Sequence, residues 1–460
     1  MSDEPRDPLE ASRLQRTTRF GGLVAGQSAR WAATRMANVA RSDDDARRAM
    51  DARAFAVAEE LVTRLGEMKG AAMKLGQVLS TVELTAVPEG ERERFKAKLA
   101  ELRDDVPPAP FKKVRKVIEQ DLGGPLDDVF EHFEERAFAA ASIGQVHRAT
   151  TLDGRPVAVK VQYPGVAEAV EADLRNIGMI LPLIKRLAPG LDVKAVAAEL
   201  RERISEELDY ELEAQNQRML HRAYTGHPFV VVPRVDTGLS TRRVLVSEYV
   251  DGRPFGEVRE LDEPARDRFG EILMRFFFAT VSNLAMSLGD PHPGNYLLCD
   301  DGRVCFLDFG LVRKVDPDHL AGEQALAVAI AEGDAQGVHD QMSALGYLPD
   351  PGSFEPEGLL EQTRTAGDWL FEPGFRRFSP DYVRDLIETG SSPRSPYFDQ
   401  MRRQTLPPAS LLMRRMEGLL LSVLGDLRAG ADWAGITMEY VAGAPPVSEL
   451  GRQDAAFWAP

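Results

Sequence analysis

Three oxygen-bearing side chains lie at the spacing of a phosphoryl-transfer site. Asp290 begins the segment Asp290-Pro291-His292-Pro293-Gly294-Asn295. Asp308-Phe309-Gly310 begins thirteen residues after Asn295. The kinase template uses one carboxylate to accept a hydroxyl proton, and an amide oxygen and a second carboxylate to hold magnesium ions. Hard divalent cations prefer these oxygen ligands. Asp-Phe-Gly alone is explained as well by chance, but its spacing from Asp290 and Asn295 favours a phosphoryl-transfer site.

The sequence between the two segments predicts a β-hairpin. Two apolar runs, Tyr296-Leu297-Leu298-Cys299 and Val304-Cys305-Phe306-Leu307, flank the turn sequence Asp300-Asp301-Gly302-Arg303. The chain has only two cysteines, Cys299 and Cys305, which cannot form a disulfide framework or a zinc site by themselves. We expect both to be reduced core residues on the facing strands.

Length and composition predict a large protein of two or three structural units. The chain has 460 residues, of which 43% are hydrophobic. It contains no apolar run of about eighteen residues that would span a membrane, and its N-terminus lacks the pattern of a secretory signal peptide. The formal net charge of −16 disfavours binding of the chain as a whole to nucleic acid or to anionic membranes.

The N-terminal segment differs from the acidic remainder. From Ala11 to Arg41 it holds six arginines and no acidic residue, interleaved with apolar residues such as Phe20 and Trp31. One interpretation is an interfacial segment that touches anionic lipid through its arginines and inserts its apolar side chains. The other is a disordered or loosely helical arm whose partner is the acidic body of the same protein.

A helix is predicted from about Ala46 to Ser80, where apolar residues recur every three or four positions. Gly66, Gly70, Lys74 and Gln77 fall on the face opposite this apolar stripe. Each glycine costs a helix about 1 kcal/mol relative to alanine, so the pair favours close approach by another backbone. From these residues alone, a solvated surface face is the favoured explanation of Lys74 and Gln77.

A proline-rich break at 106–110 marks a domain boundary, and a short helix is expected from Phe111 to Leu122. A phosphate-binding loop is expected over Ala139, Ala140, Ala141, Ser142 and Gly144, because small residues let backbone N–H groups approach phosphate oxygens. This three-alanine turn is a weak signal alone, since alanine does not adopt positive φ as glycine does. Val157 to Lys160 then alternates as a strand that ends in lysine, as in the kinase template.

An acid-rich helix is predicted from about Val193 to His221. Asp209 and Glu213 are four residues apart and share a face of this helix, so Glu213 is a candidate partner for Lys160. Glu207 lies on a different side. A solvated acidic helix explains the stretch equally well.

Two strands, over 229–233 and 243–250, precede a mainly helical second half. At Glu248 to Val250 the chain leaves the second strand and enters a loop. This arrangement is typical of an interlobe hinge, whose backbone C=O and N–H groups bind adenine. Apolar helices are expected at Phe269–Met286, Gly322–Leu345, Glu357–Phe371 and Leu411–Leu427. The tail from Ala442 contains proline and glycine and is expected to be poorly ordered.

Taken in order, these motifs closely resemble those of the UbiB/AarF/ADCK family of atypical kinase-like ATPases, over roughly residues 50 to 440. The segments that carry the resemblance are Lys74-Leu75-Gly76-Gln77, the alanine-rich loop, Val157 to Lys160, Glu207-Leu208-Asp209 with Glu213, Asp290 to Asn295, and Asp308-Phe309-Gly310. The resemblance implies an α+β, protein-kinase-like two-lobed fold. The expected parts are a basic flexible arm (1–45), a helical extension (46–105), an N-lobe (106–250), a mainly helical C-lobe (251–440) and a tail (441–460).

The resemblance also implies a role for each site residue. Lys160 would pair with the ATP phosphates and with Glu213, Asp290 would be the catalytic carboxylate, and Asn295 and Asp308 would bind Mg²⁺. Ala139 to Ser142 would replace the glycine-rich loop. In the family, the motifs matched by Lys74, Gln77, Glu207 and Asp209 pack over the active site, where a protein substrate would otherwise enter.

Departures from ordinary protein kinases bear on the substrate. Leu288-Gly289 stands where His-Arg would precede Asp290, His292 stands where many kinases carry lysine, and no Ala-Pro-Glu follows Asp308-Phe309-Gly310. The parts that usually hold a protein substrate are therefore missing or altered. The resemblance implies an ATPase that supports prenyl-quinone or isoprenoid lipid metabolism at the membrane, with lipid or lipid-enzyme partners and no nucleic acid.

Two alternatives remain open from the sequence. One is a protein or small-molecule kinase that transfers the γ-phosphate to a distinct acceptor, and the other is a nucleotide-binding scaffold without turnover. The intact set of site residues, Lys160, Glu213, Asp290, Asn295 and Asp308, disfavours the scaffold. The expected location is the cytoplasm, with peripheral attachment to a membrane.

Overall fold

The computed structural model describes residues 108–141, 143–171, 208–391 and 395–459. Several sequence-based expectations lie outside these ranges: the basic arm, the helix over 46–80 with Lys74 and Gln77, Ser142 of the alanine-rich loop, and Glu207. The described residues fall into two compact units. One contains the residues up to Leu212 together with Asp236–Glu248, and the other contains Glu213–Val235 and the residues from Tyr249 onward.

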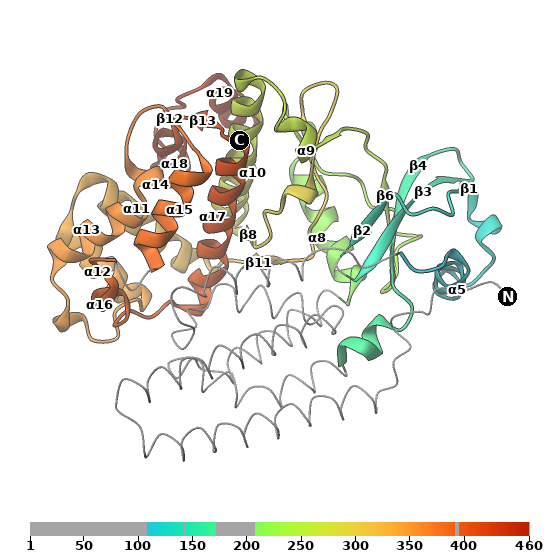
Figure 1. The fold of residues 1–460 in the computed structure, drawn as a ribbon, viewed down its shortest axis with the longest axis horizontal. Coiled ribbons are helices and arrows are strands. Elements are labelled where there is room, and N and C mark those ends of the chain that lie inside the picture. Colours follow the sequence, from blue (N-terminus) through green and yellow to red (C-terminus); the bar gives the residue numbers. More distant parts are fainter. Residues whose placement is uncertain (1–107, 142, 172–207, 392–394, 460) are drawn as a thin grey trace, which may run out of the picture. The chain divides into compact units, whose positions relative to one another are not determined.

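The first unit is an antiparallel sheet packed against a helix (Figure 1). Four strands follow the order β1-β3-β4-β6, and β2 also pairs with β3. The helix α5 forms over the predicted residues and buries Val114 and Ile118 in one cluster with Val159 of β4. The elements of this unit are α5 (Phe111–Leu122), the 3₁₀ turn η2 (Leu126–Asp128), β1 (Phe130–Phe133), β2 (Ala139–Ala141), β3 (Gly144–Thr151), β4 (Pro156–Gln162) and β6 (Val244–Glu248).

Helix α8 (Tyr210–Ala223) runs from the end of the first unit into the second. The sequence predicted one helix through position 209, but the structure corrects this, because α8 begins at Tyr210. Asp209 lies before the helix, and its Oδ1 accepts hydrogen bonds from the backbone N–H groups of Glu211 (3.0 Å) and Leu212 (3.3 Å). A carboxylate in this position satisfies N–H groups that have no partner within the helix. Asp209 therefore caps the helix, and it does not share a helical face with Glu213.

The second unit contains three small sheets. In the largest, β5 (Val230–Val231), β10 (Val304–Phe306), β9 (Tyr296–Leu298) and β7 (Arg253–Pro254) are adjacent in that order, and only the β5–β10 pair is parallel. The others are β8 (Met286–Leu288) with β11 (Val312–Lys314), and β12 (Arg376–Arg377) with β13 (Gly430–Ala431). The β9–β10 hairpin predicted between the two site segments is confirmed.

Eleven further helices complete the described part of this unit. They are α9 (Phe255–Val258), α10 (Glu263–Leu284), α11 (Pro317–Glu332), α12 (Ala335–Leu345), α13 (Pro356–Ala366), α14 (Asp368–Phe371), α15 (Pro380–Ser391), α16 (Phe398–Met401), α17 (Pro408–Leu427), α18 (Trp433–Ala442) and α19 (Glu449–Trp458). In the part of the chain that the structure describes, no helix combines the length and hydrophobicity needed to cross a membrane.

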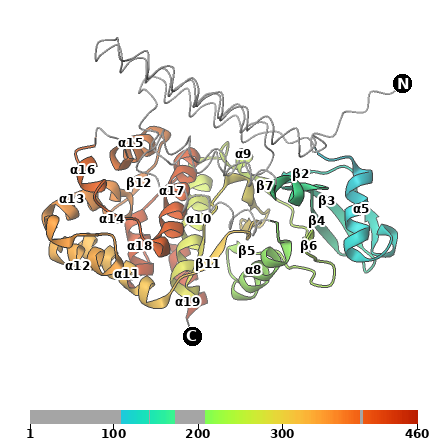
Figure 2. The same cartoon turned by 90° about the horizontal axis from the view of Figure 1, so that it is seen from below.

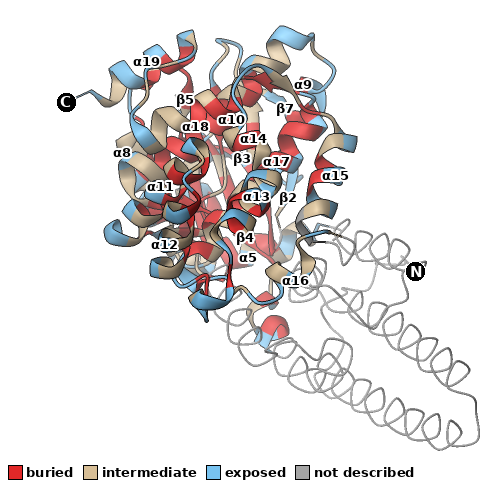
Figure 3. Ribbon diagram, turned by 90° about the vertical axis from the view of Figure 1, so that its left-hand side faces the viewer, coloured by how far each residue is buried: buried red, intermediate tan, exposed pale blue. Residues whose placement is uncertain are grey.

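Helix α10 is the centre of the hydrophobic core of this unit and lies beside α17 (Figure 2). Both helices carry many buried residues, and further buried residues lie on the elements around them (Figure 3). The ring of Phe276 stacks on Phe306 of β10 at a centroid distance of 3.6 Å, so the core directly supports the site hairpin. The predicted helix over 269–286 is too long at its C-terminal end, because Ala285 has a left-handed φ of 49° and Met286 already belongs to β8.

Three of the predicted helices differ from the structure, two because they are interrupted and one because it begins earlier. The helix expected over 322–345 is two helices, because Gly333 has a positive φ of 79° and Asp334 caps α12 by accepting a hydrogen bond from the Gly337 N–H. The helix expected over 357–371 divides at Gly367 into α13 and α14. The helix expected over 411–427 begins three residues earlier, at Pro408 of α17. Glycine and a capping carboxylate commonly end and restart helices in this way.

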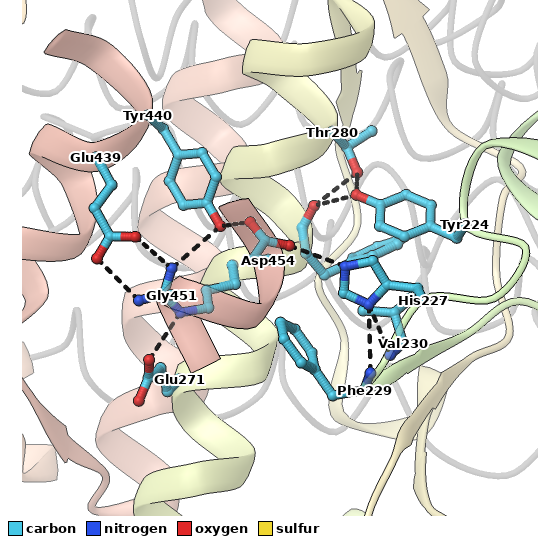
Figure 4. A network of polar contacts seen from close by, with 12 residues as sticks. Tyr224, His227, Phe229, Val230, Glu271, Thr280, Glu439, Tyr440, Gly451 and Asp454 are labelled. Carbon is cyan, nitrogen blue, oxygen red and sulfur yellow. Dashed lines mark hydrogen bonds and ion pairs between the residues drawn. The ribbon is translucent and has the colours of Figure 1, made fainter. Parts of the chain in front are cut away.

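The expectation of a poorly ordered tail was wrong, because residues 449–458 form helix α19. Its N-cap is Ser448, whose side chain accepts a hydrogen bond from the Gly451 N–H. Asp454 of α19 is buried, and its carboxylate contacts His227 Nε2 at 2.9 Å and accepts a hydrogen bond from the Tyr440 hydroxyl (Figure 4). These contacts join residues far apart in the sequence, so local composition did not reveal them.

A second buried contact ties α10 to α18 and α19. The guanidinium of Arg275 is fully buried and lies 2.7 Å from Glu271 and 2.7 Å from Glu439 of α18. It also donates a hydrogen bond to the hydroxyl of Ser448 at 3.1 Å. Removing one partner of a buried ion pair leaves an uncompensated charge, which makes Arg275 a strong determinant of C-terminal packing.

We predict that Arg275→Met lowers the free energy of unfolding of the second unit by about 3–5 kcal/mol, because Glu271 and Glu439 lose their shared partner. The matched control is Arg452→Met, which removes an exposed pair with Glu449 and should cost about 0–1 kcal/mol. Urea unfolding followed by tryptophan fluorescence compares the two variants. Equal midpoints would show that the buried pair contributes no more than the exposed one.

Candidate functional site

The pairing of β8 with β11 positions the two carboxylate segments. Leu288 pairs with Val312 in the antiparallel register, and the Gly289 N–H donates to the Leu311 carbonyl at 3.0 Å. Asp290 lies two residues after the end of β8, and Asp308 lies four residues before the start of β11. Because the strands run in opposite directions, both aspartates lie at the same end of this small sheet.

The turn between Asp290 and Asn295 is closed by local hydrogen bonds. The His292 N–H donates to the Asp290 carbonyl at 2.8 Å, and the Asn295 N–H donates to the His292 carbonyl at 2.9 Å. The His292 ring accepts a bond from the Gly294 N–H at 3.1 Å, which caps the 3₁₀ turn η3 (Pro293–Asn295). His292 thus shapes this turn, at the position where many kinases carry a lysine.

The β9–β10 hairpin brings Asn295 to Asp308. Tyr296 pairs with Phe306, and the Leu307 N–H donates to the Asn295 carbonyl at 3.0 Å. Neither cysteine forms a disulfide, as expected, but only Cys305 is buried and Cys299 is half-buried. The hairpin therefore acts as a rigid link between the two candidate metal ligands.

The remaining hydrogen-bonding capacity of these ligands suits a divalent cation. The Asn295 amide nitrogen lies 3.4 Å from the Asp290 carbonyl, which leaves the amide oxygen available. Asp308 uses Oδ1 to accept from the Gly310 N–H at 2.9 Å, which leaves Oδ2. Within the described ranges, no group of three or more His, Cys, Asp or Glu side chains forms a metal cage. The amide oxygen of Asn295 and the carboxylate of Asp308 are oxygen donors of the kind that Mg²⁺ takes, since this ion is usually held by one or two carboxylates together with substrate phosphates and water.

A pocket with an apolar floor connects these groups. Its lining residues are Phe276, Phe277, Leu288, Asp290, Asn295, Tyr296, Phe306, Leu307, Asp308 and Leu311. The Tyr296 ring packs edge-on against Phe306, and its buried hydroxyl has no hydrogen-bond partner among the described residues. Burial, and then the charges of Asp290 and Asp308, raise the pKa of this hydroxyl well above its usual range, so it stays protonated.

Helix α8 also contributes to the Asp308 segment. The amide of Asn216 donates to the Phe309 carbonyl at 3.0 Å, and both residues are buried. The carboxylate of Glu213 is buried and lies close to Gly310, because a Cβ built on Gly310 would lie 3.9 Å from Glu213 Oε2. The sequence analysis missed Asn216, although its position three residues after Glu213 places it on the same side of the helix.

The first unit carries the candidate phosphate-binding residues. The alanines over 139–141 form strand β2 and pair with β3, with Ala141 opposite Gly144. The expected three-alanine turn is therefore corrected, because all three alanines belong to strand β2. A Cβ at Gly144 would lie 2.3 Å from the Val161 carbonyl oxygen and 2.7 Å from the Tyr210 hydroxyl, so only glycine fits there.

Lys160 lies on β4, between Val146 of β3 and Leu245 of β6. Its Nζ is 5.0 Å from the centroid of the Tyr210 ring, which is a cation–π distance. Glu248 ends β6 and is exposed, and Val250 follows it in the second unit. Lys160 and Glu213 belong to different units, so their pairing stays a prediction, as does adenine binding by the backbone near Glu248 and Val250.

We predict that Asn216→Leu lowers the free energy of unfolding of the second unit by about 1–3 kcal/mol, because the buried Phe309 carbonyl loses its donor. Amide hydrogen exchange should accelerate over residues 309–311. The control is Gln215→Leu, at an exposed position on the same helix. If both variants exchange at the same rate, Asn216 does not hold this segment.

Comparison with known proteins agrees with this geometry. Residues 101–342 match the ABC1 atypical kinase-like domain, which covers more than half of the chain. The chain is 30% identical over 376 residues to the mitochondrial atypical kinase COQ8B of Rattus norvegicus, across 81% of this chain and 70% of that protein. It is 31% identical over 296 residues to the mitochondrial atypical kinase coq-8 of Caenorhabditis elegans, across 63% of this chain. The chain spans only 39% to 49% of the length of that protein and of two further curated relatives.

A solved structure shows the same fold. The Mycobacterium tuberculosis protein Rv3197, determined in complex with erythromycin, is 32% identical and has a TM-score of 0.62, with 83% of this chain and 95% of that chain aligned. The α+β, protein-kinase-like fold expected from the motifs is thus confirmed. From its domain match, its relatives and its fold, this chain belongs to the UbiB/AarF/ADCK family of atypical kinase-like proteins.

Proposed function

We propose that this protein is an ATP- and Mg²⁺-dependent phosphoryl-transfer enzyme that acts chiefly as an ATPase. The observation that carries the proposal is the convergence of Asp290, Asn295 and Asp308 on one pocket of the second unit. A carboxylate, an amide oxygen and a second carboxylate in this order are what the kinase template requires. The same template is the basis for the individual roles.

Asp290 would orient the attacking water or hydroxyl group and accept its proton. Asn295, through its free amide oxygen, and Asp308 would hold Mg²⁺, which supplies charge neutralisation for the phosphates when bound. The protonated Tyr296 hydroxyl lies in the same pocket and would donate a hydrogen bond to water or to a carboxylate there. The apolar floor strengthens each of these electrostatic interactions, because it lowers the local dielectric constant.

The nucleotide-binding part of the proposal rests on the first unit and α8. Lys160 would pair with the phosphates and with Glu213, and backbone groups near Glu248 and Val250 would bind adenine. Strand β2 and Gly144 at the start of β3 would cover the phosphates. By the family resemblance, Lys74, Gln77, Glu207 and Asp209 would gate the site, with Asp209 also capping α8.

Hydrolysis is favoured over transfer to a protein acceptor. Leu288-Gly289 replaces the His-Arg of the kinase catalytic loop, and the Ala-Pro-Glu motif that follows the Asp-Phe-Gly segment in kinases is absent from the sequence. By resemblance to the family, the reaction would serve prenyl-quinone or isoprenoid lipid metabolism at a membrane. Transfer of the γ-phosphate to a protein or small molecule is the second candidate, and a non-hydrolysing scaffold is the third.

Purified protein is expected to release phosphate from Mg-ATP, and Asp308→Asn is expected to lower the rate about 100-fold or more, because a metal-binding charge is lost. Lys160→Ala should raise the KM for ATP and lower kcat. The matched control is Asp300→Asn, at the exposed tip of the hairpin that joins the two metal ligands. Absence of phosphate release with ATP binding intact would favour the scaffold, whereas a phosphorylated acceptor would favour the kinase.

The basic N-terminal segment gives a separate prediction about the membrane. The full chain should pellet with vesicles that contain phosphatidylglycerol more than a chain that starts at Ser42, because the truncation removes the basic segment from Ala11 to Arg41 with its six arginines. The difference should shrink at high salt and on neutral phosphatidylcholine vesicles. Equal pelleting of both chains would remove the membrane role from this segment.

A further inference from the structure

Helix α17 places a guanidinium on the strand end that carries Asp290. The Nε of Arg415 donates to the Gly289 carbonyl at 2.9 Å, and one terminal nitrogen of the same side chain lies 3.9 Å from Asp290 Oδ1. The side chains are only 17% and 26% exposed, so water screens their interaction less than it screens a surface pair. A single side chain thus holds both the backbone before Asp290 and its carboxylate.

The sequence at position 289 makes this approach feasible. A Cβ on Gly289 would lie 2.2 Å from Leu412 Cδ1 and 2.7 Å from Leu311 Cδ2, so a larger residue would force these two side chains to shift. On the same helix, Met416 contacts the Ser287 hydroxyl of β8 through its sulfur at 4.0 Å. Positions 412, 415 and 416 are spaced to share one helical face, and this face packs on β8.

The neighbouring arginine has a different partner. Arg414 forms an ion pair with the buried Glu323 and lies 2.6 Å from Glu417. Burial opposes ionisation of Glu323, but Arg414 and hydrogen bonds from Ser410 and Tyr347 outweigh it and lower the pKa of its carboxyl. Arg414 therefore anchors α17 to α11, which leaves the orientation of Arg415 toward β8 well defined.

We propose that Arg415 is a positioning residue that fixes the backbone and the carboxylate of Asp290 for phosphoryl transfer. The inference rests on the catalytic role of Asp290 proposed above. In the kinase template an arginine directly precedes the catalytic aspartate, whereas here Leu288-Gly289 occupies those positions. Here the guanidinium comes instead from Arg415 on α17, which lies 126 residues after Gly289 in the sequence. Guanidinium suits this role because it is permanently charged and offers several donors in one rigid plane.

The test uses the full chain with Arg415→Gln and Arg415→Lys. Arg415→Gln should lower kcat for Mg-ATP hydrolysis about 10- to 100-fold with little change in KM, because misplacement of a catalytic group affects the chemical step. Arg415→Lys keeps the charge and should recover part of that loss. The control is Arg402→Gln, which removes an exposed ion pair with Asp399 at the same 3.9 Å separation.

A double-mutant cycle separates positioning from general destabilisation. Because Arg415 acts through Asp290, Arg415→Gln should have little further effect on the residual rate of an Asp290→Asn protein. Additive losses would overturn the proposal, and so would a wild-type kcat in Arg415→Gln. If Asp290→Asn alone hydrolyses ATP at the wild-type rate, the proposed function fails instead.

Hydrogen exchange tests the inference without turnover. Amides over residues 289–295 should exchange at least about fivefold faster in Arg415→Gln than in the wild type or in Arg402→Gln, because the loop loses its anchor. Unchanged exchange in Arg415→Gln would overturn the positioning role, even for a protein that hydrolyses no ATP. Arg415→Lys serves the same measurement if Arg415→Gln does not fold.

Discussion

The antiparallel pairing of β8 with β11 is the constraint on which the candidate site depends. These two strands have three residues each, and their register places the segments of Asp290 and Asp308 at one end. The β9–β10 hairpin between them closes the same loop from the other side. Two short ladders therefore determine the positions of Asp290, Asn295 and Asp308, and the rest of the second unit supports these ladders.

That support comes from side chains that bind backbone carbonyls. Asn216 of α8 holds the carbonyl of Phe309, and Arg415 of α17 holds the carbonyl of Gly289. Each donor comes from a helix outside the motif it stabilises. Short strands are weak by themselves, so contacts of this kind limit the motion of a site that must hold charged groups close together.

An apolar core beneath a charged site gives the second unit its electrostatic character. Phe276 stacks under β10, Phe309 points into the main hydrophobic cluster, and Tyr296 presents a buried hydroxyl to the pocket. Charges that face such a surface interact more strongly than in water. Next to Phe276 on α10, Arg275 forms a buried ion pair with Glu439 of α18, and Asp454 of α19 accepts a hydrogen bond from Tyr440 of α18. The core thus connects the site hairpin to helix α19.

The sequence by itself determined the features that local pattern encodes. These are helix α5, the β9–β10 hairpin and the spacing of Asp290, Asn295 and Asp308, because amphipathic periodicity, turn residues and chemical type are properties of short segments. Tertiary structure alone decided the roles of Asn216 and Arg415, the order of the tail from residue 449 and the start of α8 after Asp209. The roles and the tail depend on contacts between residues that are distant in the sequence. The start of α8 depends on the hydrogen bonds that Asp209 accepts from backbone N–H groups. In a run of acidic residues, the sequence does not show which aspartate caps a helix and which lies inside one.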